Sequence, residues 1–395
     1  MKKFFTLAVM FALAVGFTSC GGDDGGSTPP PAPTGKYVNY AKSESGLTLA
    51  ATHHFLEVSE EAEPVTIEFA VYNNGQDVTS NASVYVVEGN SSKKLVNAKF
   101  TPEATGVYQF WASYGVDNTK NDALLNITAV SDMPAILADE NPSSTNFERG
   151  VLLIKATGVN CNNCPRATDG IHMFYDNSDY ADNTVQMALH TYDSGHALSS
   201  KAAVTLTSQA GLGASYPAIK LNFDKLVPTL GSSEIARLLD NEISAICANT
   251  SETAIAASTS YNEATGTISV AAKVKCDVPS KYKVTAVLLQ DNVYFPQVGA
   301  FKEEHNVHSA IVRAAAPTTG VGFALNNGEE TKAGEVYNFC CEFKTSDLYA
   351  KGVGEYALDV LRDVRVIVYV QATDRIVDNV VACGLNQQVG FAYNN

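Results

Sequence analysis

Apolar and polar positions alternate along the first third of the chain in a way that predicts strands. In "VTIEFAVY", every second residue from Val65 to Val71 is apolar, which is the period-2 pattern of a half-buried strand. The following "NNG" is typical of a tight turn. Further strand patterns occur in "ASVYVV", "KLVNAKF", "GVYQFWASYG" and "ALLNITAV". Their spacing predicts a β-sandwich over residues 36–130.

One of these patterns also indicates the type of sandwich. "PEATGVYQFWASYG" resembles the late strand of bacterial immunoglobulin-like domains, which makes Tyr108 a candidate corner tyrosine. Trp111 is the only tryptophan, and as a strand residue it is predicted to lie in the core. The segment contains no cysteine pair that could join the two sheets.

Strand and helix patterns alternate over residues 149–249, after a proline-interrupted stretch, residues 131–148, that we interpret as a linker. "RGVLLIKATG" is a nearly continuous apolar run, as expected for a central strand, and "TVQMALHTY" and "YPAIKLNF" are later strands. Helices are predicted after the first strand, over "LSSKAAVTLTSQAG" and over "SSEIARLLDNEISAI", the last capped by Ser232 or Ser233. This alternation predicts a mostly parallel sheet with helices on its faces.

Strand patterns return over residues 250–395 and predict a C-terminal β-sandwich domain. The runs include "TISVAAKVKC", "YKVTAVLLQD", "EVYNFCCEF" and "VRVIVYVQ".

The N-terminus has the features of an export signal. "MKKFFTLAVMFALAVGFTSC" begins with two lysines and continues with an apolar stretch too short to span a bilayer, so residues 1–19 are predicted to be a signal peptide. "GFTSC" resembles a bacterial lipobox, in which Cys20 is diacylated and becomes the mature N-terminus. The alternative is an ordinary signal peptide with an incidental cysteine. Residues 20–35 are rich in Gly and Pro, which is typical of a flexible tether.

Charge and motifs exclude several functions. The net charge of −15 and the lack of a basic cluster argue against nucleic-acid binding. The sequence contains no phosphate-binding loop, dinucleotide fingerprint or G-x-S-x-G motif, so no cofactor is predicted. His305 with His308 and His190 with His196 lie close in sequence, but we interpret them as surface histidines and predict no metal site.

The motif "GVNCNNCPRAT" holds the best candidate chemistry. Cys161 is predicted at the start of a helix, where backbone N–H groups and the helix dipole favour a thiolate, and Cys164 would be the resolving thiol. The alternative is a permanent local disulfide, formed in an oxidising envelope compartment, that closes a very small loop. The residues themselves leave both interpretations open.

Five further cysteines bear on the disulfide pattern. If Cys20 is lipidated, seven cysteines remain and at least one is unpaired. Cys340 and Cys341 are neighbours on a predicted strand and point to opposite faces, so they are not expected to bond to each other. One of them could pair with Cys276 or Cys383, or these residues and Cys247 could be free thiols.

Two resemblances combine these observations. A C-x-x-C after a first strand, followed by Tyr216-Pro217 at the start of a later strand, resembles the thioredoxin fold, which implies that Pro217 is cis and lies beside the cysteines. The order of lipobox, "FTPEATGVYQFWASYG", "LLIKATGVNCNNCP" and C-terminal strands is similar to that of the outer membrane protein 28-related lipoproteins of the Bacteroidota. Many members carry Trp before the first cysteine and Gly-Tyr between the two, where this chain has Asn160 and Asn162-Asn163. The resemblances imply a multidomain fold of α/β plus all-β type, with an immunoglobulin-like β-sandwich, a thioredoxin-like domain and a C-terminal β-sandwich.

Two functions fit this organisation. The first is a lipid-anchored outer-membrane or cell-surface protein with a binding or structural role, whose partner is an envelope or host protein or a glycan. The second is an envelope thiol–disulfide oxidoreductase that uses Cys161, Cys164 and Pro217. We favour the first, because sandwich modules on both sides of the cysteine-bearing domain add reach and contact area rather than chemistry.

Overall fold

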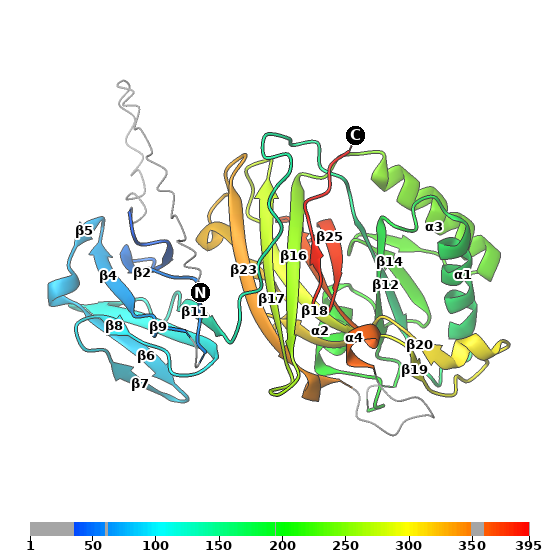
Figure 1. Ribbon diagram of the computed structural model, residues 1–395, viewed down its shortest axis with the longest axis horizontal. Coiled ribbons are helices and arrows are strands. Elements are labelled where there is room, and N and C mark those ends of the chain that lie inside the picture. The colour runs from blue at the N-terminus through cyan, green and yellow to red at the C-terminus, as the bar shows by residue number, and fades with distance from the viewer. Residues whose placement is uncertain (1–34, 60–61, 194, 349–358, 395) are drawn as a thin grey trace, which may run out of the picture.

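The computed structural model describes residues 35–59, 62–193, 195–348 and 359–394. The predicted signal peptide, the candidate lipidation site Cys20 and nearly all of the predicted tether therefore lie outside the described residues. Within those ranges, no helix is both long and apolar enough to cross a membrane. Among the described residues, strands outnumber helices, and an N-terminal two-sheet unit lies beside a larger body that contains the helices (Figure 1).

The N-terminal unit is a β-sandwich, as the alternating pattern predicts. One sheet has the strand order β1-β2-β4-β5 with β8 on β4, and the other has the order β3-β11-β9-β6-β7 with β10 on β9. Apolar side chains from both sheets, such as Leu49, Phe69 and Phe110, form one core. The strands are β1 (Asn39–Lys42), β2 (Leu47–Ala51), β3 (Phe55–Glu57), β4 (Ile67–Asn73), β5 (Gln76–Asp77), β6 (Ser83–Glu88), β7 (Ser91–Lys94), β8 (Lys99–Phe100), β9 (Gly106–Tyr114), β10 (Asp117–Asn118) and β11 (Leu125–Val130), with a 3-10 turn η1 (Thr79–Asn81).

The structure agrees with the sequence prediction for one aromatic residue of β9 and differs from it for another. The hydroxyl of Tyr108 donates a hydrogen bond to the carbonyl of Ala104, four residues upstream, at 2.7 Å, as a corner tyrosine does. The prediction for Trp111 was wrong, because its neighbours Phe110 and Ala112 face the core and the period of two directs Trp111 outward. There its ring stacks on Tyr85, with centroids 4.1 Å apart.

The larger body is built on a nine-stranded sheet of order β15-β14-β12-β13-β21-β18-β24-β25, with β22 on β18. Its strands are β12 (Val151–Thr157), β13 (Thr184–His190), β14 (Ala218–Leu221), β15 (Lys225–Val227), β18 (Lys283–Gln290), β21 (Ile311–Ala316), β22 (Phe323–Ala324), β24 (Val364–Gln371) and β25 (Val377–Gly384). The expectation of a mostly parallel sheet was wrong: among its pairs only β12–β13 and β13–β21 are parallel. Apolar periodicity identifies a strand and its buried face, but it carries no information about strand direction.

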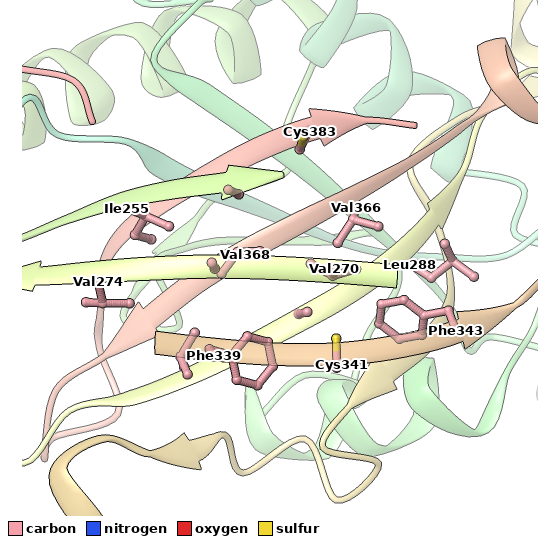
Figure 2. Packing of buried hydrophobic residues seen from close by; sticks show 14 of the residues in the cluster. Ile255, Val270, Val274, Leu288, Phe339, Cys341, Phe343, Val366, Val368 and Cys383 are labelled. Atoms are coloured by element: carbon pink, nitrogen blue, oxygen red, sulfur yellow. The ribbon is translucent and has the colours of Figure 1, made fainter. Parts of the chain in front are cut away.

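Most of the C-terminal strands are divided between two sheets. A four-stranded sheet of order β23-β17-β16-β26 packs against one face of β18 and β24, and Ile255, Leu288 and Phe339 meet in that core (Figure 2). Its strands are β16 (Thr253–Asn262), β17 (Thr267–Cys276), β23 (Val336–Lys344) and β26 (Gln388–Val389). The 3-10 turn η3 (Leu325–Gly328) precedes β23 in the chain, and η4 (Thr345–Asp347) follows it. Strands β18, β21, β22, β24 and β25 belong to the nine-stranded sheet that also contains β12, whereas β19 (Val293–Tyr294) and β20 (Val307–His308) form a separate pair. The predicted division between residues 249 and 250 therefore separates segments that share one sheet.

Helices cover the nine-stranded sheet on both faces. Helices α1 (Cys164–Asn177) and α3 (Ser232–Cys247) pack on β12, β14 and β15, while α2 (Lys201–Gln209) packs on the opposite face with Leu152 and Met187. The short α4 (Val360–Asp363) precedes β24. The expected order of three strands and three helices is confirmed, with β15 as an additional strand. The cap of α3 is Gly231, and the serines after it are already helical.

Irregular chain connects the two units and runs along the four-stranded sheet. The fully buried ammonium of Lys275 donates to Asp139 Oδ2 and Tyr393 Oη, each at 3.0 Å, and to the carbonyl of Pro142 at 2.9 Å. These charge-assisted bonds fix the predicted linker to the body.

Candidate functional site

The cysteine motif lies between the end of β12 and the start of α1. Cys161 and Cys164 form a disulfide with Cα atoms 5.4 Å apart. The N–H of Cys161 donates to the carbonyl of Gly158, and the N–H of Cys164 donates to that of Cys161, both at 3.2 Å. Cys164 is the first residue of α1, so the motif is placed at a helix start as the sequence predicts.

The disulfide is buried, with Cys161 3% and Cys164 1% exposed. A segment that connects β18 to β21, residues 291–310, lies over the motif, and we call it the cover segment. It contains the short pair β19 (Val293–Tyr294) and β20 (Val307–His308) and the 3-10 turn η2 (Glu303–Asn306). A substrate thiol must approach the attacked sulfur directly, so in this conformation the disulfide cannot be exchanged with another protein.

Gln297 fastens the cover segment to the cysteine loop. Its side-chain amide nitrogen lies 2.9 Å from the carbonyl oxygen of Val159, 3.1 Å from that of Cys161 and 3.3 Å from that of Gly158. The N–H of the next residue, at position 298, donates to the Val159 carbonyl at 2.8 Å. Gln297 itself is buried. These bonds join the cover segment to the carbonyls of the loop that follows β12.

Gly299 allows the cover segment to approach the cysteine loop closely. A Cβ atom at this position would lie 2.4 Å from the carbonyl oxygen of Asn162, and the φ of 75° favours glycine.

Ionic contacts join the cover segment to α1. The Lys302 ammonium contacts the buried Asp169 carboxylate, and His305 Nε2 lies 3.8 Å from Asp169 Oδ1. Burial raises the pKa of Asp169 and is the largest single effect, but hydrogen bonds from Lys302 and Ser232 together with the nearby positive charge of Lys302 outweigh it, so the pKa is lowered. His172 Nδ1 lies 3.8 Å from Glu304 Oε1, and burial lowers the pKa of His172. Asp169 is therefore ionised at neutral pH and holds the cover segment by charge.

Three of these residues are close enough to be considered as metal ligands. Asp169, Glu304 and His305 each place one ligand atom within 4.8 Å of the others. Lys302 contacts both carboxylates, and its Nζ is 3.4 Å from Glu304 Oε1. A metal ion would have to displace this ammonium, so the arrangement is better suited to an ion-pair network than to a metal centre.

A buried lysine, Lys155, is linked to Cys164 through hydrogen bonds. Lys155 of β12 is 7% exposed, and its Nζ donates to Thr168 Oγ1 at 3.1 Å. The Thr168 hydroxyl in turn donates to the carbonyl of Cys164 at 3.3 Å. Burial lowers the pKa of Lys155 from 10.5 to about 8. A single lysine within the apolar run "VLLIKATG" was a signal for this group that we did not use, whereas nothing in the sequence pointed to Gln297.

The histidines lie deeper than expected. His190, His305 and His308 are 3%, 2% and 8% exposed, so their interpretation as surface residues was wrong. The centroids of the His190 and His308 rings are 5.2 Å apart, and His308 Nε2 donates a hydrogen bond to the Phe295 carbonyl at 3.0 Å. Burial lowers the pKa of His308 to about 4, so this histidine is neutral at physiological pH. His305 and His308 belong to the cover segment and are buried where it packs against the body, and His190 lies against His308. Local sequence cannot reveal this packing.

Pro217 lies at the same end of the sheet as the cysteines. The Tyr216–Pro217 peptide is cis, and the next residue, Ala218, pairs with Ala156 near the end of β12. The Tyr216 hydroxyl shares a hydrogen bond of 3.0 Å with Thr191 Oγ1.

The other five cysteines among the described residues form no disulfide. Cys276, Cys340, Cys341 and Cys383 are buried free thiols, and Cys247 is a partly buried one. Cys341 packs in the core between the sheets and Cys340 on the other face, so they point apart as expected. Burial raises the pKa of Cys340 to about 12, which makes its thiol unreactive.

Comparison with known proteins identifies a solved structure with a similar fold. HBP35 of Porphyromonas gingivalis is similar to this chain with a TM-score of 0.50 and 18% identity, over 64% of this chain and 79% of that chain. A β-glucosidase from Kluyveromyces marxianus has 10% identity over 87% of this chain and 44% of that chain, and its TM-score of 0.18 carries no argument. No family model and no curated protein matches the chain.

Loss of the Gln297 amide should expose the disulfide. Gln297→Ala removes hydrogen bonds worth about 1 kcal/mol each, so we expect the bond to be reduced by dithiothreitol roughly tenfold faster. Alkylation at timed intervals and mass spectrometry measure the rate. Gln76→Ala, at an exposed residue of β5, is the control. Equal rates in wild type and Gln297→Ala would contradict the fastening role.

Lys155→Met should stabilise the chain at neutral pH. A pKa lowered from 10.5 to about 8 means that burial of the charge costs about 3 kcal/mol below pH 8. As pH rises from 8 to 10.5, the native lysine loses its proton before the unfolded one does, so the gain should fade. Urea unfolding at pH 7 and pH 10 measures this, with the exposed Lys201→Met as control. A loss of stability in Lys155→Met that is constant with pH would contradict the account.

Proposed function

We propose that this chain is a lipid-anchored protein of the outer membrane, exposed at the cell surface, with a binding or structural role in which Cys161–Cys164 is a structural disulfide. The burial of the disulfide beneath the cover segment carries the proposal, because both cysteines are at most 3% exposed. Enzymatic thiol exchange needs an accessible sulfur and a low-pKa thiolate.

The arrangement of the domains supports a scaffold role. The tyrosine corner and two-sheet packing of residues 36–130 support an immunoglobulin-like description. Strands β12 to β15 with α1, α3 and the cis-Pro217 support a thioredoxin-like description of the cysteine-bearing part. HBP35, which shares the fold, comes from a member of the Bacteroidota.

The anchor rests on the N-terminal sequence alone. The short apolar stretch, the "GFTSC" ending and the Gly/Pro-rich tether support lipidation at Cys20.

An envelope thiol–disulfide oxidoreductase is the second candidate. The position of Cys164 at the start of α1 and the placement of Pro217 at the same sheet end favour it. This function requires the cover segment to be displaced before each reaction.

A disulfide-exchange assay separates the two functions. The full chain, with dithiothreitol as electron donor, should reduce insulin no faster than its Cys161→Ser/Cys164→Ser variant. That variant should lose about 2 kcal/mol of unfolding free energy, since the bond closes only a very small loop. Catalysis by wild type well above the variant would establish the oxidoreductase.

A separate test concerns the anchor: Cys20→Ser should move the chain from the envelope fraction to the soluble fraction.

A further inference from the structure

A cleft of about 790 Å³ lies between the N-terminal sandwich and the four-stranded sheet. Its walls come from the start of the described chain, the linker, β17, β23 and the turn after β22. The volume falls within the range of small-molecule binding sites, which also occur preferentially between domains. It lies away from the cysteine loop and shares no lining residue with it.

Apolar side chains form part of the cleft wall. Val38, Met133 and Val336, from three distant segments, line the cleft although they are 49%, 40% and 44% exposed. Phe55 and Phe323 add an aromatic wall, with ring centroids 5.3 Å apart. Exposed apolar side chains gathered at one concave place indicate a binding surface rather than chance exposure.

Asn327 lines the cleft and bridges the two units. Its Oδ1 accepts a hydrogen bond from the Tyr40 N–H at 3.0 Å, and its Nδ2 donates to the Val38 carbonyl at 3.1 Å. A site of this kind is already formed before a ligand arrives, which lowers the entropic cost of binding.

His54 offers the cleft an unused acceptor. Its ring hydrogen-bonds to the backbone of Val38, and burial lowers its pKa to about 4, so the ring is neutral at pH 7. Its Nδ1 is buried and has no hydrogen-bond partner among the described residues. A buried acceptor without a partner is costly, and a ligand N–H or O–H would remove that cost.

The cleft carries a positive charge in an otherwise acidic protein. Lys332 Nζ pairs with Glu335 Oε1 at 3.2 Å, so these two lining residues neutralise each other. Lys273 of β17 also lines the cleft, and within the described ranges its side-chain ammonium has no hydrogen bond or ion pair. The chain as a whole has a net charge of −15, so this local positive charge favours a small anion over a polyanion.

We propose that this cleft binds a free, small organic acid, which is an apolar ring or chain with one anionic group. The apolar body lies against Val336 and the aromatic wall, the anionic group pairs with Lys273, and a donor on the ligand bonds to His54 Nδ1. This inference rests on the proposed binding role and gives it a site and a ligand class.

Two fluorescent naphthalenes of similar shape test the proposal on the full chain. 1-Anilinonaphthalene-8-sulfonate carries one negative charge, and N-phenyl-1-naphthylamine carries none. We expect saturable binding of both to wild type. Lys273→Met should weaken sulfonate binding about tenfold, which is the effect of losing one charge-assisted contact, and change amine binding less than twofold. Val336→Asp should weaken both.

Matched controls are available elsewhere on the surface. Lys201→Met on α2 and Val116→Asp, at a valine that is 98% exposed, should leave both affinities unchanged. Circular dichroism and the thermal midpoint verify that each variant is folded.

Each other outcome overturns a stated part. If Lys273→Met weakens both probes equally, or neither, the cleft does not recognise an anion. If Val336→Asp leaves both affinities unchanged, or wild type binds neither probe, the cleft is not the binding site. If the chain does not reduce insulin and binds neither probe, the cleft proposal is refuted and the structural role of the disulfide stands. If the chain reduces insulin and binds both probes in the cleft, the structural role of the disulfide is refuted and the cleft proposal stands.

Discussion

The continuity of the nine-stranded sheet is the constraint on which the cysteine site depends. β13 and β21 are parallel, and Ala188 near the end of β13 pairs with Ile311 at the start of β21. The connection between β18 and β21 therefore lies at the end of the sheet where β12 ends and the cysteine loop begins. Because the C-terminal strands join this sheet, their connecting segment becomes the cover of the disulfide. A separate C-terminal domain would leave the same motif open to solvent.

The cover segment changes the chemistry of every group beneath it. It packs on the loop that holds the buried Cys161, it brings its own His305 and His308 into the interior beside His190, and it closes over a layer that contains the buried Lys155. Desolvation lowers the pKa of Lys155 and of His308, so the charged forms of these bases are disfavoured. Polar contacts hold the cover segment in place, through the hydrogen bonds of Gln297 and the Asp169–Lys302 ion pair. Hydrogen bonds and ion pairs depend on direction more than apolar contacts do, so they fix the position of the segment on the cysteine loop.

Local sequence was sufficient for local structure and insufficient for the site. The period of two located the N-terminal strands, and the helix after Cys164 followed from its apolar face, because both depend on residues a few positions apart. Trp111 was misplaced although the same period, read from Phe110, directs it outward. The pairing of β13 with β21 and the contact of Gln297 with Val159 join residues more than a hundred positions apart, and no pattern within a single segment encodes them. The position of Pro217 was anticipated only through a resemblance.

The central claim is that Cys161–Cys164 is a sealed structural disulfide, and its reduction potential tests this most directly. The full chain is equilibrated in dithiothreitol and glutathione buffers, alkylated and analysed by mass spectrometry. A structural bond should have a potential below about −300 mV, beyond reduction by a glutathione pool. A potential between roughly −120 and −270 mV, the range of thiol–disulfide oxidoreductases, would contradict the account.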